Sequence, residues 1–100
     1  MAHEVIWTAA ALDHLAELFD YLAESIAARD ALAYCDAFFP ATARLADFPR
    51  MCAETPEYGE GVRRLTRPDG RLVLYEVDDN AQVVRILAVV GLRQLPKKIK

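Results

Sequence analysis

Cationic side chains gather in two short stretches, both in the second half of the chain. A run of nine residues holds Arg63, Arg64, Arg67 and Arg71, and the last eight residues hold Arg93, Lys97, Lys98 and Lys100. Closely spaced cations bind phosphate groups or acidic protein surfaces. The two stretches therefore predict a binding patch for a nucleic acid or an acidic partner. The alternative is a solvated face followed by a basic tail.

Residues that could act as nucleophiles or metal ligands are few and scattered. Ser25 is the only serine, and nothing in the sequence places it beside a histidine. Cys35 and Cys52 form no CxxC pair, so we expect two free thiols. His3 and His14 lie eleven residues apart with no acidic cluster between them. We expect no metal site and no cofactor, and the sequence identifies no catalytic residue.

The composition is that of a globular protein. Of the 100 residues, 54% are apolar and 27% are charged, which predicts one domain over residues 1–100. The longest apolar run, residues 86–90, is too short to cross a bilayer, and no secretory leader is evident, so we expect a cytoplasmic location. Charge is unevenly divided, with three arginines against eight acids in residues 1–50 and nine cations against seven acids in residues 51–100.

Local patterns in the first half predict a strand and two helices. Residues 4–7 are β-branched and aromatic, which predicts a short strand, and Thr8 follows as a helix N-cap. Apolar residues then recur every three or four positions, and a second helix is expected to have Asp30 as its N-cap and to end at Pro49. Pro40 predicts a kink or two shorter helices. The expected core side chains are Leu12, Leu15, Phe19, Leu22, Leu45 and Phe48.

Three further strands are predicted at residues 62–66, 71–77 and 82–90, joined by tight turns into an antiparallel meander. Alternation gives the last two strands two apolar faces: Leu72 and Leu74 against Val73, Tyr75 and Val77, then Val84, Ile86, Ala88 and Val90 against Val83, Leu87 and Val89. Two helices cover only one face, so we expect a partner protein or a second copy to cover the other. The alternative is that its apolar residues are scattered surface side chains that need only the long loop of residues 49–60 as cover.

Five segments, taken in order, carry a family resemblance. They are Val5–Thr8 before an alanine-rich helix, Leu45-x-x-Phe48-Pro49, Gly61–Leu65, Leu72–Val77, and Val83–Val90 followed by Gly91-Leu92-Arg93. Together they resemble the RelE/ParE superfamily of bacterial type II toxins, and most of all its ParE branch of plasmid-stabilisation toxins. The resemblance spans nearly the whole chain. It implies a two-layer α+β fold of order β-α-α-β-β-β, with two helices packed on one face of an antiparallel sheet.

The resemblance also implies a function and a partner. Such a toxin is held inactive by a small antitoxin encoded beside it, here a ParD-like one, which lays an extended or helical segment over the toxin. Candidate contacts for that segment are Leu72, Leu74, Val84 and Ile86. Toxins similar to ParE poison DNA gyrase, whereas those similar to RelE cleave messenger RNA on the ribosome.

RNA cleavage needs cations that stabilise charge on phosphorus and groups that move protons. Tyr75 is a conceivable proton carrier, but we expect it to pack on the sheet. RelE-like enzymes carry a Tyr or a His-Tyr pair after the arginine that Arg93 matches, and residues 94–98 contain neither. The acidic balance of the chain, with a pI near 5.3, also opposes docking on a polyanion.

We therefore expect a gyrase inhibitor that needs no catalysis, with a ribosome-dependent mRNA endoribonuclease as the alternative. The candidate residues for toxicity and target binding are Arg63, Arg64, Arg71, Arg93, Lys97 and Lys98. No helix carries a basic face, so we do not expect sequence-specific DNA binding by this chain alone. Because no apolar run is long enough to cross a bilayer, we expect no membrane partner.

Overall fold

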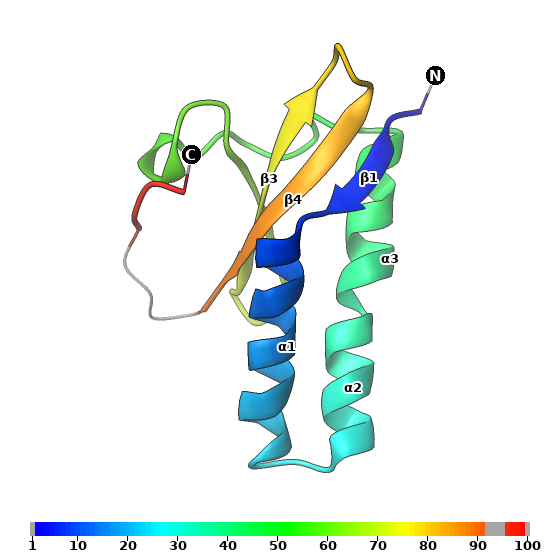
Figure 1. Ribbon diagram of the computed structural model, residues 1–100, viewed down its shortest axis with the longest axis vertical. Coiled ribbons are helices and arrows are strands. Elements are labelled where there is room, and N and C mark those ends of the chain that lie inside the picture. Colours follow the sequence, from blue (N-terminus) through cyan, green and yellow to red (C-terminus); the bar gives the residue numbers. More distant parts are fainter. Residues whose placement is uncertain (1, 92–95, 100) are drawn as a thin grey trace.

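The computed structural model describes residues 2–91 and 96–99. Its elements are β1 (Glu4–Trp7), α1 (Ala9–Ala23), α2 (Ala28–Asp36), α3 (Phe38–Ala43), the 3₁₀ turns η1 (Arg44–Ala46) and η2 (Pro56–Tyr58), β2 (Arg63–Thr66), β3 (Leu72–Asp78) and β4 (Val83–Val90). The four strands form one sheet of order β1-β4-β3-β2. This confirms the predicted α+β fold and its element order (Figure 1).

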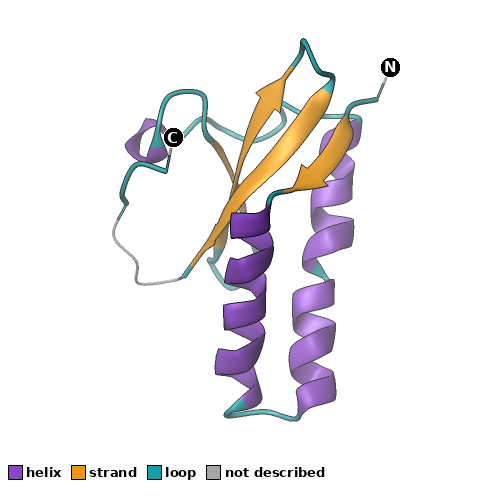
Figure 2. Ribbon diagram, in the orientation of Figure 1, coloured by secondary structure: helices purple, strands orange, loops and turns teal. Residues whose placement is uncertain are grey.

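The sheet is mixed, not wholly antiparallel as expected. β2, β3 and β4 form the predicted antiparallel meander, whereas β1 runs parallel to β4. The parallel strands β1 and β4 cannot be joined by a tight turn and need a long crossover connection. The chain between them includes the helices, which cover one face of the sheet. Figure 2 shows α2 and α3 on one side of the strands and the short turn η2 on the other.

The start of α1 confirms Thr8 as its N-cap. The Ala11 backbone N–H donates to the Thr8 hydroxyl oxygen at 3.3 Å, and the same hydroxyl donates to the carbonyl of Ile86 at 2.7 Å. The first bond satisfies an N–H that has no partner within the helix, and the second ties the cap to β4. One side chain therefore fixes where the helix begins and how it leaves the sheet.

The second helix is divided, as Pro40 predicts. Its N-cap is Ala27, three residues before the expected cap Asp30, and the helix breaks at Ala37 between α2 and α3. Proline lacks the N–H that would bond to the carbonyl of Asp36, which stops the regular ladder there. Thr42 links α3 to β1, because its hydroxyl donates to the Phe38 carbonyl at 3.0 Å and accepts from the Trp7 indole at 3.2 Å.

The core between the helices and the sheet differs from the expected set at two positions. Leu15 and Leu45 are buried and Phe19 and Leu22 are partly buried, as predicted, but Leu12 is 45% exposed and Phe48 is 64% exposed. At the first position, Ala11 takes the core contact one residue earlier. At the second, the 3₁₀ turn η1 shortens the repeat from 3.6 to about 3 residues and rotates Phe48 away.

A smaller cluster lies on the opposite face of the sheet, and the chain itself covers it. Its buried members are Tyr58, Val62, Leu74, Ala88 and Val90. The alternation predicted for β4 is wrong beyond Ile86, because Leu74 pairs with Ala88 while Tyr75 pairs with Ile86. The unmatched Leu87 forms a β-bulge that moves Ala88 and Val90 to the face opposite Ile86. The 56–62 segment therefore covers part of the face that was expected to need a partner.

None of the helices within the described ranges has the length and apolar character that a membrane span requires.

Candidate functional site

The sheet face that points away from α1 and α2 is here called the second face, and it carries some of the candidate residues. On β3 it holds Leu72 and Leu74, and Arg64 of β2 stands opposite Leu74. The C-terminal segment reaches the same side, where the Ile99 N–H donates to the Tyr58 carbonyl at 2.8 Å. Figure 1 shows the C-terminus beside the green turn of η2. The fold thus brings Arg64 of the first basic stretch and the C-terminal segment to one side of the molecule.

Arg63 is held by the protein itself. Its guanidinium donates to the carbonyl of Cys52 at 2.6 Å and lies 3.4 Å from a carboxylate oxygen of Glu54, and only 17% of the side chain is exposed. Its register partner is Tyr75, so it points toward the helix side of the sheet. These contacts fasten β2 to the preceding loop, which leaves little of Arg63 for a target.

Arg71 is occupied in the same way. Its guanidinium donates to the Asp69 carboxylate at 2.6 Å and to the Tyr34 hydroxyl at 3.0 Å, and it stacks over the Tyr34 ring at 5.7 Å. The Tyr34 hydroxyl in turn donates to Asp69. Partial burial alone would raise the pKa of Asp69, but the bonds from Tyr34 and Arg71 outweigh it and hold that pKa below its usual value. This cluster joins the β2–β3 turn to α2.

Three of the predicted cations are free. Arg64, Lys97 and Lys98 are exposed, and none has an ion pair or hydrogen bond from its side chain to any residue that the structure describes. They are called the second-face cations below. Arg93, the remaining candidate, lies outside the described residues. The geometry thus divides the candidate cations into two that stabilise the fold and three that are available to a partner.

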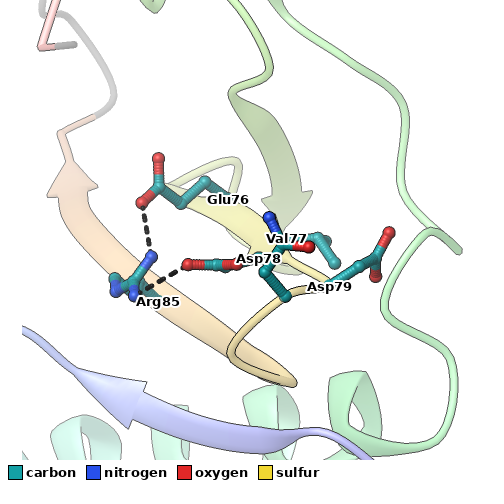
Figure 3. Close-up of a pocket in the computed structure, with 6 residues that line it drawn as sticks. Glu76, Val77, Asp78, Asp79 and Arg85 are labelled. Carbon is teal, nitrogen blue, oxygen red and sulfur yellow. Dashed lines mark hydrogen bonds and ion pairs between the residues drawn. The ribbon is translucent and has the colours of Figure 1, made fainter.

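The other half of the second face is acidic, and the sequence did not point to it. Arg85 lies between two carboxylates, 3.2 Å from Glu76 and 3.0 Å from Asp78 (Figure 3). Hydrogen bonds from the Ala81 N–H and then from Arg85 lower the pKa of Asp78. A hollow of about 410 Å³ opens here, lined by Glu76, Val77, Asp78, Asp79, Asn80 and Arg85. Only the pairing of Glu76 with Arg85 across the hairpin could have predicted this network.

The sequence of this chain matches one known protein family. The family described as "ParE toxin of type II toxin-antitoxin system, parDE" matches residues 5–96. The chain belongs to the ParE toxin family. This confirms the resemblance to the RelE/ParE superfamily that the sequence motifs carry. No curated protein matches the sequence significantly.

Solved structures share the fold of this ParE-family chain. A chain of the chromosomal ParDE system from P. aeruginosa has a TM-score of 0.79 at 20% identity, over 92% of this chain and 98% of that one. The M. tuberculosis RelBE2 toxin–antitoxin complex gives 0.61 at 22% identity, over 91% and 99%. A mutant of the E. coli toxin RelE in the free state gives 0.65 at 17% identity, over 93% and 86%.

Tyr75 packs on the sheet, as predicted, and is unavailable as a proton carrier in this ParE-family toxin. Its side chain is fully buried on the helix side, and its hydroxyl has no hydrogen-bond partner at bonding distance within the described residues. Burial, and after it the neighbouring Cys52, raises the pKa of this hydroxyl. A phenol that is buried and hard to ionise cannot exchange protons with a bound RNA.

Replacing Tyr75 with phenylalanine is therefore expected to raise the free energy of unfolding by about 1 kcal/mol, because a buried unsatisfied hydroxyl costs about 1–3 kcal/mol. Urea denaturation followed by circular dichroism measures the change. Tyr21→Phe is the control, since Tyr21 is 64% exposed and should show no change. A loss of more than about 1 kcal/mol in Tyr75→Phe would show that the hydroxyl has a partner after all.

The four residues expected at the antitoxin interface do not share a surface. Leu74 is fully buried and Leu72 partly buried under the 56–62 segment on the second face. Val84 and Ile86 are fully buried on the helix side. These four candidates thus lie on both faces of the sheet, because β4 changes faces at its bulge, and the chain itself covers part of the second face.

Proposed function

We propose that this ParE-family toxin inhibits DNA gyrase through its second-face cations, and that a ParD-like antitoxin neutralises it. The observation that carries the proposal is the composition of the second face. It offers exposed, unpaired Arg64, Lys97 and Lys98, and no exposed histidine or tyrosine within the residues that the structure describes. Binding an acidic protein surface needs only such cations in a fixed arrangement.

The acidic half of the same face also argues against RNA as the substrate. Glu76, Asp78 and Asp79 outnumber Arg85 and Arg50, the latter paired with Asp79, so phosphates approaching that half would meet net negative charge. Asp78 is engaged by the Ala81 N–H and by Arg85, which lower its pKa and make it a weak proton donor at neutral pH. A ribosome-dependent endoribonuclease is therefore the second candidate and not the first.

The antitoxin proposal is supported by structural neighbours that come from toxin–antitoxin systems. The P. aeruginosa chain comes from a ParDE system, and the M. tuberculosis chain is part of a RelBE2 toxin–antitoxin complex. By analogy, we propose that this toxin also forms a complex with an antitoxin. Gyrase acts on the bacterial chromosome, so the proposed site of action is the cytoplasm.

Purified toxin assayed in parallel for inhibition of gyrase supercoiling and for cleavage of mRNA on programmed ribosomes tests the target. We expect inhibition of supercoiling and no transcript cleavage. Arg93→Ala should be included, because Arg93 matches a family arginine beyond the last strand. Transcript cleavage that disappears in Arg93→Ala, with supercoiling unaffected by the toxin, would overturn the gyrase proposal and establish the nuclease.

A further inference from the structure

Cys52 lies at the start of a segment that runs beside β2 at the edge of the sheet. The Arg64 N–H donates to the Ala53 carbonyl at 3.1 Å, and the Thr55 N–H donates to the Val62 carbonyl at 2.7 Å. Cys52 is a free thiol that packs against the core on the helix side and remains partly exposed. The fold thus places this thiol at the boundary between core and solvent, where a small oxidant reaches it.

A buried hydroxyl without a partner faces this thiol. Tyr75 is fully buried, and its hydroxyl makes no hydrogen bond within the part of the chain that the structure describes. Burial raises the pKa of this hydroxyl most, and the Cys52 thiol beside it raises that pKa further. The hydroxyl therefore stays protonated and is a fixed hydrogen-bond donor. A buried donor without a partner is rare in folded proteins, and it favours an acceptor that the unmodified chain lacks.

Positive charge is fixed beside the same residue. The Arg63 guanidinium donates to the Cys52 carbonyl at 2.6 Å, and only 17% of the Arg63 side chain is exposed. Its ion-pair partner Glu54 lies 3.4 Å away and is 61% exposed, so solvent screens this carboxylate more than it screens the guanidinium. A fixed cation beside a sulfur stabilises the negative charge that develops while the sulfur reacts.

The other cysteine of the chain lacks these features. Cys35 of α2 is 4% exposed, and its thiol donates to the Leu15 carbonyl of α1 at 3.9 Å. Burial raises the pKa of the Cys35 thiol, which keeps it in its unreactive, protonated form. The two cysteines therefore differ in access and in chemical surroundings, and Cys35 serves as an internal comparison for Cys52.

We propose that Cys52 is a modification site for hydrogen peroxide, and that the Tyr75 hydroxyl holds the resulting sulfenic acid. The sulfur attacks one peroxide oxygen, so a sulfur–oxygen bond forms and the oxygen–oxygen bond breaks. The other oxygen leaves as hydroxide and takes up the thiol proton to become water. The sulfur is oxidised by the same electron pair that reduces the peroxide. The oxygen now attached to Cys52 is the acceptor that the Tyr75 hydroxyl lacks.

Treating the purified toxin with hydrogen peroxide in the presence of dimedone, a reagent that traps sulfenic acids, tests this proposal. Trypsin cuts after arginine and releases the two cysteines in separate peptides, residues 30–44 and 51–63. Mass spectrometry should find the dimedone adduct on the 51–63 peptide and not on the 30–44 peptide. Met51 lies in the same peptide as Cys52, but its sulfoxide does not react with dimedone and so does not contribute to the adduct.

Tyr75→Phe is expected to slow adduct formation at Cys52 roughly fivefold, which is the equivalent of one net hydrogen bond. The variant keeps the buried ring and removes only the hydroxyl, so it should fold. Tyr21→Phe is the matched control, because it removes an exposed hydroxyl on α1 and should leave the rate at its wild-type value. Adduct formation at Cys52 should also be faster in folded toxin than in toxin unfolded in urea.

Three results would contradict the proposal. Equal rates in the wild type and Tyr75→Phe would show that the hydroxyl does not hold the product. A rate that is no faster in folded toxin than in urea would show that the fold adds nothing to a free thiol. An adduct mainly on the 30–44 peptide would show that Cys35 is the reactive thiol. Each result would leave the gyrase and antitoxin proposals untouched, because the peroxide reaction does not depend on the target of the toxin.

Discussion

Truncating Phe38 to alanine is expected to lower the free energy of unfolding by about 3–5 kcal/mol. Phe38 is 1% exposed at the start of α3, its ring meets Tyr34 edge-on at 5.7 Å, and the Arg67 guanidinium lies over it at 5.3 Å. Removing the ring leaves a cavity between α3 and the sheet that rigid neighbours fill only in part. Urea denaturation followed by far-UV circular dichroism measures the loss.

Phe48→Ala is the control that isolates burial from residue type. Phe48 is 64% exposed, so its truncation should change the free energy of unfolding by no more than about 0.5 kcal/mol. Since domains of this size are stable by about 5–15 kcal/mol, Phe38→Ala removes a large share of the total. Equal effects of the two substitutions would show that the core has been placed around the wrong phenylalanine.

The sequence predicts those parts of the fold that depend on neighbouring residues. The strand of residues 4–7, the Thr8 cap and the division of the second helix at Pro40 each follow from the chemistry of a few adjacent positions. The parallel pairing of β1 with β4 and the bulge at Leu87 do not, because both depend on contacts between residues distant in the chain. The burial of Ala11 in place of Leu12 also depends on distant contacts, because close packing against another helix favours a small side chain there.

The candidate site shows the same division between local and distant causes. Clustering of arginines is visible in the sequence, but the partners that hold Arg63 and Arg71 are not. Tyr34 is 37 residues from Arg71, and only the folded chain brings them together. Arg64 differs from Arg63 by a single position, yet strand alternation turns it to the opposite face and leaves it free. Equal charge in the sequence thus corresponds to unequal availability in the structure.

Reversing the charge of that free arginine is expected to cost the toxin its activity. In Arg64→Glu, the concentration that half-inhibits gyrase supercoiling should rise at least about tenfold, because a carboxylate would face the acidic surface that we propose the second-face cations bind. Lys97→Glu and Lys98→Glu should each act in the same direction. The melting temperature should stay constant, since the Arg64 side chain makes no ion pair or hydrogen bond with the described part of the chain.

Arg44→Glu is the matched control for this variant. Arg44 is also exposed and has no ion pair in the described residues, but it lies in η1 on the helix side, and both substitutions change the net charge equally. Equal loss of inhibition in the two variants would mean that overall charge steers the toxin to its target and that no particular face binds it. Wild-type inhibition by Arg64→Glu would remove the second face from the gyrase contact and leave the segment around Arg93 as the part of the chain to test. A defined contact requires that inhibition is lost in Arg64→Glu and kept in Arg44→Glu. Of the two substitutions, only Arg64→Glu alters the second face and one of the second-face cations.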